Sequence, residues 1–243
     1  MISYHLLTNP GERDHNEDYI GMWNERGIYW FLLADGLGGH GMGEVASKCV
    51  VETALANIRN SVGTIPMNSL FESSQEALLN QQAEMGSFSE MKTTMVALCI
   101  DANGAQFSHV GDSRGYYFEG NKFRFVTHDH SVPRMLADAR RIKEKDIPHH
   151  PDRNKLLRVM GIEWEDPQEE IDKAIGVNIK KSQAFLLCSD GFWEWISEKD
   201  MQHCLKHAHD AKEWIESMQE IVVKSGKGKG MDNYSAIGII ISE

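Results

Sequence analysis

An apolar run meets a carboxylate and then a group of glycines in Ile28-Tyr29-Trp30-Phe31-Leu32-Leu33-Ala34-Asp35-Gly36-Leu37-Gly38-Gly39-His40-Gly41-Met42-Gly43-Glu44. The run from Ile28 to Ala34 predicts a buried strand, because it is short, apolar on both faces and followed by turn residues. Glycine tolerates positive φ and leaves room for a close neighbour, so the turn is expected to present Asp35 and the Gly36 carbonyl. After Glu44 the apolar residues recur at helical spacing, which predicts a helix.

Three interpretations of this turn compete. Gly36, Gly38 and Gly41 match the G-x-G-x-x-G fingerprint of dinucleotide-binding proteins. The charge of Asp35 would oppose a pyrophosphate, and the acidic residue that a dinucleotide site requires falls near Glu52, inside the expected helix. The other two interpretations are a metal site, which needs further carboxylates from elsewhere in the chain, and an acidic turn without chemistry.

Composition narrows the class of protein. The chain has 243 residues and no linker-like tract, so a single domain spanning 1–243 is expected. Its 25 Lys and Arg residues against 36 Asp and Glu residues give a net charge of −11, which disfavours nucleic acid and anionic membranes as partners. The four cysteines lie far apart and predict reduced thiols. Without a signal peptide or an apolar stretch of about 18 residues, we expect a cytoplasmic monomer.

The hydrophobic pattern predicts strands and helices along the whole chain. Strands are expected at 3–7, 19–23, 93–100, 105–110, 115–118, 123–127, 174–179, 184–188 and 234–241. Four helices are expected. The first begins near residue 43, the second spans 67–85, and the third and fourth end near residues 207 and 226. In the second helix Leu70, Phe71, Leu78 and Met85 are predicted to share a face. Asp210 and Glu213 predict a capping box for the last helix.

Several of these strands are joined by short turns, which only antiparallel neighbours permit. Strands that are apolar on both faces must also be covered on both faces. The sequence therefore predicts an α+β fold, a four-layer α-β-β-α sandwich in which two antiparallel sheets pack together between outer helices. The polar region 129–161 is expected to be an insertion over the surface.

Four aspartates lie at the ends of strands that are predicted to be central: Asp35, Asp112, Asp190 and Asp232. A buried carboxylate is costly unless it is paired or binds a cation, so four together indicate a metal site. Glu17 and Asp18 join them if the first loop folds over the same end. Oxygen donors favour Mg²⁺ or Mn²⁺ over zinc. Two such ions can activate a bridging water for attack on phosphorus, and Arg13 can pair with a phosphate, so we expect phosphate-ester hydrolysis.

Six segments in this order resemble the motifs of the metal-dependent protein serine/threonine phosphatases of type 2C, the PPM family, and especially its compact bacterial members. The segments are Arg13-Asp14-His15-Asn16-Glu17-Asp18, Ala34-Asp35-Gly36-Leu37-Gly38-Gly39-His40, Gly111-Asp112-Ser113-Arg114, Thr127-His128-Asp129-His130-Ser131, Ser189-Asp190-Gly191-Phe192-Trp193 and Asp232-Asn233. The resemblance covers nearly the whole chain. It implies the same four-layer sandwich. It also implies that the substrates are proteins that a partner kinase has phosphorylated on serine or threonine.

The resemblance also implies roles for individual residues. Asp35 would bridge two Mn²⁺ or Mg²⁺ ions, and the Gly36 carbonyl, Asp190 and Asp232 would complete the direct ligands. Glu17 and Asp18 would act through bound waters, and Asp112 would hold a third, weaker ion with Asp190. Arg13 would bind the substrate phosphate, and Asn233 would lie beside Asp232 at the site. The region 129–161 would include a mobile flap near the substrate.

One position departs from the family. Many eukaryotic relatives have His directly after Asp-Gly, as a candidate general acid, whereas this chain has Leu37. We therefore expect a metal-bound water to protonate the leaving oxygen, with His40 as the second choice. Two other functions stay open at this stage: hydrolysis of small phosphoesters, and a non-catalytic module that binds phosphoproteins. The G-x-S-x-G match at Gly111–Gly115 is not expected to be a nucleophile elbow, because the residues after it predict a strand.

Overall fold

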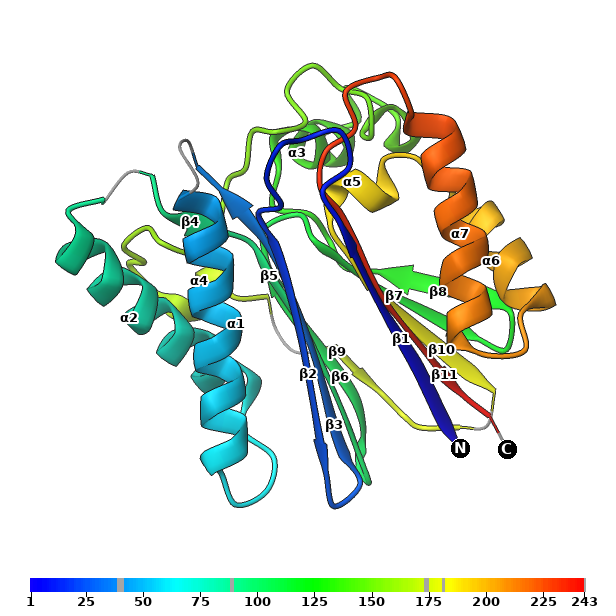
Figure 1. Ribbon diagram of the computed structural model, residues 1–243, viewed down its shortest axis with the longest axis horizontal. Coiled ribbons are helices and arrows are strands. Elements are labelled where there is room, and N and C mark those ends of the chain that lie inside the picture. The colour runs from blue at the N-terminus through cyan, green and yellow to red at the C-terminus, as the bar shows by residue number, and fades with distance from the viewer. Residues whose placement is uncertain (39–41, 88–89, 173–174, 181, 243) are drawn as a thin grey trace.

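The computed structural model describes residues 1–38, 42–87, 90–172, 175–180 and 182–242. Its strands form two sheets that pack face to face, with helices on the outer face of each sheet (Figure 1). All strand pairs of both sheets are antiparallel in the described residues. The predicted four-layer α-β-β-α sandwich is confirmed.

The first sheet contains the opening stretch of the sequence. Its strand order is β2 (Asp18–Glu25), β3 (Ile28–Leu37), β5 (Met95–Asp101), β6 (Gly104–Val110) and β9 (Ile175–Val177), and β4 (Lys92–Thr93) pairs with β3. Two long helices, α1 (Met42–Asn60) and α2 (Met67–Met85), lie on the same side of the molecule as this sheet (Figure 1).

The second sheet joins the two ends of the chain. Its strand order is β1 (Ile2–Asn9), β11 (Tyr234–Ile241), β10 (Gln183–Cys188), β7 (Arg114–Glu119) and β8 (Lys122–Val126). Helices α6 (Glu198–His207) and α7 (Ala211–Gly226) cover its outer face (Figure 1). The shorter helices are α3 (Val132–Asp138), the 3-10 helix at Glu144–Asp146, α4 (Pro167–Glu170) and α5 (Asp190–Trp193). Within the described ranges, none of the helices is long and apolar enough to cross a membrane.

Strand β3 shows how alternation builds the layers. Trp30 and Leu32 belong to the buried cluster shared with α1 and α2, whereas Phe31 and Leu33 belong to the cluster between the sheets. Side chains on a strand alternate between faces, so a strand buried on both faces must be apolar throughout. Burial of each such side chain stabilises the fold by roughly 1.5–3 kcal/mol. A third cluster packs the second sheet against α6 and α7.

The same alternation directs the carboxylate that follows. Asp35 has the parity of Phe31 and Leu33, so its side chain belongs on the face between the sheets. Asp18 lies opposite Asp35 in the register of β2 and β3, and therefore shares that face. Two carboxylates are thus placed side by side at one end of the space between the sheets.

Four expectations need correction. Strand β3 continues to Leu37 and does not end at Ala34, because β2 and β4 supply backbone partners for the additional residues. Met85 is 47% exposed and lies outside the buried face of α2. The sequence predicts no helix in the region 129–161, but the structure has α3 there, with Ser131 as its N-cap. The capping box is half formed, since Asp210 caps α7 but the Glu213 carboxylate accepts from the His209 N–H.

Candidate metal centre

The acidic residues singled out in the sequence meet at one end of the sandwich. A cavity of about 190 Å³ there is lined by Arg13, Glu17, Asp35, Gly36, Asp112, Asp190, Asp232 and Asn233, together with Leu37, Gly38, Asn154 and Leu156. These residues come from the first loop, β3, the loop after β6, α5 and the approach to β11. Antiparallel strands from both sheets thus bring distant parts of the chain to one place. His40 falls outside the described residues.

The position of Gly36 has no room for a side chain. A Cβ there would lie 2.2 Å from the Gly43 carbonyl oxygen, at the start of α1, and 2.7 Å from the Glu17 carbonyl oxygen. The Gly36 N–H donates to that Glu17 oxygen at 3.0 Å. Close packing of three backbone segments therefore requires glycine, and it fixes the first loop against β3.

Asp18 is a buried carboxylate next to the metal cavity. Its Oδ2 accepts a hydrogen bond from the Ser189 hydroxyl at 2.7 Å, whereas its Oδ1 is buried and has no hydrogen-bond partner among the described residues. A buried carboxylate oxygen without a donor costs free energy unless a cation compensates it. Ser189 is in turn held by the Ser235 N–H at 2.9 Å, so this contact ties β2 to the second sheet.

The electrostatics of the carboxylates favour a cation at this site. Burial, together with the charges of Asp190 and Asp232, raises the pKa of Asp18 to about 7. Burial and repulsion from Asp232 raise the pKa of Asp190 to about 6. The pKa values of Asp35 and Asp112 are raised for the same two reasons, burial first and neighbouring carboxylates second. The donors are oxygens, so this set suits a hard cation such as Mg²⁺ or Mn²⁺.

Arg13 and Asn233 join the first and last loops at this site. Arg13 Nη2 lies 2.8 Å from Asp232 Oδ2, and half of the arginine side chain is exposed. Asn233 accepts a hydrogen bond from the Glu17 N–H at 2.8 Å and donates to the carbonyls of Pro10 and His15 at 2.9 and 2.8 Å. The amide thus makes three hydrogen bonds to the first loop, which fixes Glu17 relative to Asp232.

A buried ion pair supports the loop that carries Asp112. Arg114 donates through Nε and Nη2 to both carboxylate oxygens of Asp129, at 2.7 and 2.6 Å. Its guanidinium also lies over the Trp193 ring, 3.6 Å from the centroid, and Trp193 Nε1 donates to the Asp112 carbonyl at 3.0 Å. This network links the Asp112 loop to α5, which begins at Asp190. The sequence alone did not assign Arg114 and Asp129 a role, although a charge at the edge of apolar strands signals a need for a partner.

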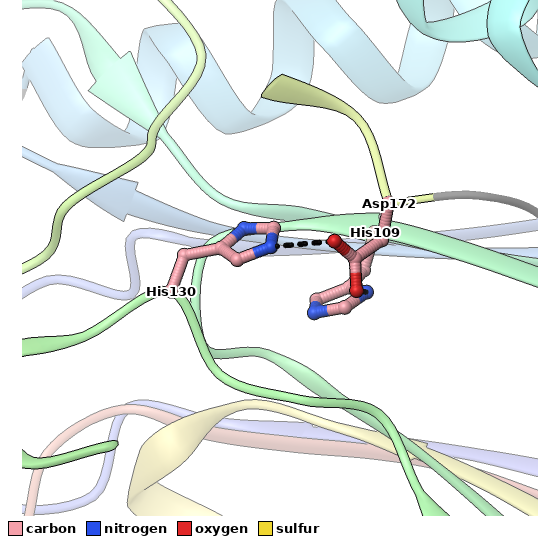
Figure 2. Close-up of side chains that lie close together, drawn as sticks. All are labelled: His109, His130 and Asp172. Atoms are coloured by element: carbon pink, nitrogen blue, oxygen red, sulfur yellow. Dashed lines mark hydrogen bonds and ion pairs between the residues drawn. The ribbon is translucent and has the colours of Figure 1, made fainter. Parts of the chain in front are cut away.

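His109, His130 and Asp172 form a second cluster (Figure 2). Their candidate ligand atoms lie within 4.8 Å of one another, a spacing that a transition-metal ion could use. Burial and the neighbouring His130 lower the pKa of His109 to about 4, so that its ring is neutral. His109 Nε2 donates to the His128 carbonyl at 2.8 Å, and within the described part of the chain its buried Nδ1 has no hydrogen-bond partner.

The hydrogen bonds of His130 favour a structural role for this cluster. His130 Nδ1 accepts from the Gly111 N–H at 3.1 Å, and its Nε2 donates to Asp172 Oδ1 at 2.9 Å. A metal ligand normally donates its other ring N–H, the opposite of what His130 does. Arg158 also lies 3.6 Å from Asp172 Oδ1. The cluster therefore braces the turn beside Asp112 against residue 158 of the region 129–161.

Comparison with known proteins agrees with this geometry. Residues 11–232 match the family model described as Protein phosphatase 2C. The serine/threonine phosphatase stp of Listeria monocytogenes is 31% identical over 234 residues, which are 93% of this chain and 90% of that protein. The chain belongs to the protein phosphatase 2C family. The resemblance to its bacterial members is confirmed, and the chain is an enzyme of this family.

Solved structures of protein phosphatase 2C enzymes share the fold. The crystal structure of the Mycobacterium tuberculosis serine/threonine phosphatase PstP/Ppp is 26% identical, with a TM-score of 0.84 over 100% of this chain and 99% of that one. The catalytic domain of the serine/threonine phosphatase PstP, solved in complex with two manganese ions, is 24% identical and has a TM-score of 0.83 over 100% and 99% of the two chains.

Proposed function

We propose that this protein phosphatase 2C member hydrolyses phosphoserine and phosphothreonine in proteins, at a centre of two Mn²⁺ or Mg²⁺ ions and without a covalent phosphoenzyme. The convergence of five acidic residues on one cavity, with Asp18 opposite Asp35 in the sheet, carries this proposal. The orphaned oxygen of Asp18 and the raised pKa values of Asp18 and Asp35 support it, because a bound cation would compensate both.

Each acidic residue has a part in holding the ions. Asp35 would hold both ions, as the resemblance implies. Its pKa is raised by burial and by the charges of Asp18, Asp190, Asp112 and Asp232, so it lies within the influence of all four. The Gly36 carbonyl, Asp190 and Asp232 would complete the direct ligands. Glu17 and Asp18 would act through water, and Asp112 would hold a third, weaker ion with Asp190. When bound, the ions supply an activated water for in-line attack and offset charge on the phosphate oxygens.

The remaining residues position the substrate. The exposed guanidinium of Arg13 would leave Asp232 to the ions and pair with the phosphate, for which its planar fork is suited. Asn233 keeps Glu17 and Asp232 in register through its three hydrogen bonds. Asn154, from the region 129–161, lines the same cavity, which supports a flap over the substrate there. We further propose that 1–243 acts as one catalytic domain on proteins phosphorylated by a serine/threonine kinase.

The test is hydrolysis of phosphothreonine peptides and of a small aryl phosphate, with Mn²⁺ and with chelator. Wild type should turn over both substrates only with metal, and Asp190→Asn should lose the activity. Asp210→Asn is the matched control, because Asn caps a helix as well as Asp does and Asp210, at the start of α7, does not line the metal cavity. Efficient turnover of a metabolite with little activity on peptides would favour a small-phosphoester phosphatase. Phosphopeptide binding without turnover would favour a non-catalytic module.

A further inference from the structure

A second cavity adjoins the proposed metal centre. It has a volume of about 200 Å³ and shares Asn154, Asp190 and Asp232 with the metal cavity. An extended peptide whose phosphate reaches the ions would therefore run past this second cavity. The chain advances roughly 3.3–3.6 Å per residue, so side chains within two positions of the phosphoresidue are the ones in reach.

The wall of the second cavity contains three basic side chains beside the acidic Asp190, Glu194 and Asp232, in a chain with a net charge of −11. His149, Arg153 and Lys229 line it together with Trp195. Lys229 Nζ lies 5.2 Å from the centroid of the Trp195 ring, within the range of a cation–π interaction. The His149 ring centroid is also 5.2 Å from that of Trp195. One aromatic side chain thus holds two basic groups beside the metal centre.

The two basic residues with a permanent charge differ in their partners. Arg153 Nε lies 2.8 Å from Glu194 Oε1, so a carboxylate largely compensates its charge. Lys229 contacts the Trp195 ring and is paired with no carboxylate of the described residues. Lys229 is therefore the basic residue of this wall whose charge can pair with a ligand.

The loop that carries Lys229 is held in a defined shape. The Glu12 carboxylate accepts hydrogen bonds from the backbone N–H groups of Gly228, Gly230 and Met231 at 2.6, 2.8 and 3.1 Å. Gly228 and Gly230 adopt φ values of +77° and +75°, which side chains other than glycine disfavour. These contacts fasten the Gly-Lys-Gly-Lys-Gly loop, so Lys229 is presented at a fixed edge of the cavity.

We propose that this cavity, the Lys229 subsite, binds an anionic group that lies within two residues of the phosphoresidue in the substrate. The inference rests on the proposed function and names its substrate class: phosphoproteins with an acidic side chain or a second phosphate beside the target. With the two proposed ions bound, Asp190 and Asp232 add no net repulsion to an anion there. A second phosphate carries more charge than a carboxylate and should bind better.

The test uses three phosphothreonine peptides that differ only at the two positions on each side: alanine, glutamate, or one phosphoserine among alanines. Wild type should show a lower KM for the glutamate peptide than for the alanine peptide, and the lowest for the doubly phosphorylated one. In Lys229→Ala the ratio of kcat/KM between the glutamate and alanine peptides should fall roughly two- to fivefold, the range of an exposed ion pair. The change should lie in KM and leave the ratio of kcat values alone.

Lys227→Ala is the matched control, because Lys227 has the same charge and lies on the same loop but does not line the cavity. It should keep the wild-type ratio. An equal loss in both lysine variants, or a wild type without preference for anionic flanks, would overturn the proposal. Fluorescence anisotropy of the same labelled peptides, with and without Mn²⁺, should give the same order of affinities. If the aryl phosphate and all three peptides resist hydrolysis, the proposed function fails, while the anisotropy still decides the fate of the subsite.

Discussion

The buried pair of Arg114 and Asp129 allows a quantitative test of how the site is supported. Their side chains are 6% and 1% exposed, and two hydrogen bonds of 2.7 and 2.6 Å join them. Removing one partner leaves the other charge buried, at a cost of about 3–5 kcal/mol. For a chain of this size each kcal/mol lowers Tm by roughly 2–4 °C, so Arg114→Met and Asp129→Leu should each lower Tm by about 6–20 °C.

The double variant decides whether the pair explains this cost. Replacing both charges by apolar groups of similar size is often neutral, so Arg114→Met with Asp129→Leu should be more stable than either single variant. Thermal and urea unfolding of the four proteins at saturating Mn²⁺ would measure this coupling. We also expect lower turnover in the single variants, because Trp193 packs on Arg114 and donates to the Asp112 carbonyl. A double variant that loses the sum of the two single effects would refute the reasoning.

Three further predictions concern the rest of the site. Gly36→Ala should cost about 1–3 kcal/mol of stability and most of the turnover, because its Cβ would lie 2.2 Å from the Gly43 carbonyl oxygen. The control Gly176→Ala should cost less than about 1 kcal/mol, because no atom of the described residues lies within 4 Å of its Cβ. In chelator, the pKa of Asp18 is about 7 in the folded state and near 3.9 in the unfolded state. The free energy of unfolding should therefore fall as the pH rises from about 4 to 7. Urea titrations should show this trend, and Mn²⁺ should reverse it. His40→Ala should keep metal-dependent turnover of aryl phosphate, and complete loss with intact metal binding would make His40 the general acid.

The layers of the fold could be predicted because their cause is local in the sequence. The run from Ile28 to Ala34 is apolar at every position. A strand needs apolar side chains at every position only when both of its faces are covered, as both faces of β3 are. The carboxylate at its end, Asp35, then has to lie at the edge of the core. The extension of β3 to Leu37 could not be predicted, because it depends on pairing with β4, more than fifty residues further along the chain.

The contacts that support the site could not be predicted from the sequence for a similar reason. Glu12 and the Gly228 N–H are 216 residues apart, and nothing near either of them signals the other. The Ser189 hydroxyl reaches Asp18 across 171 residues, although Ser189 looks like an ordinary helix cap from its neighbours. Motif order located the acidic residues, but the side chains that hold them in place are chosen by tertiary packing.

The most direct test of the central claim, that strand-end carboxylates form one two-ion centre, is the number of Mn²⁺ ions bound per chain, measured by calorimetric titration. Wild type should bind two ions tightly. Asp35→Asn should lose both, because Asp35 would bridge them, while its metal-free form should be more stable than wild type, since a repelling buried carboxylate is gone. Arg13→Ala should keep both ions. A wild type that binds no Mn²⁺, or an Asp35→Asn protein that still binds two ions with wild-type affinity, would contradict the account.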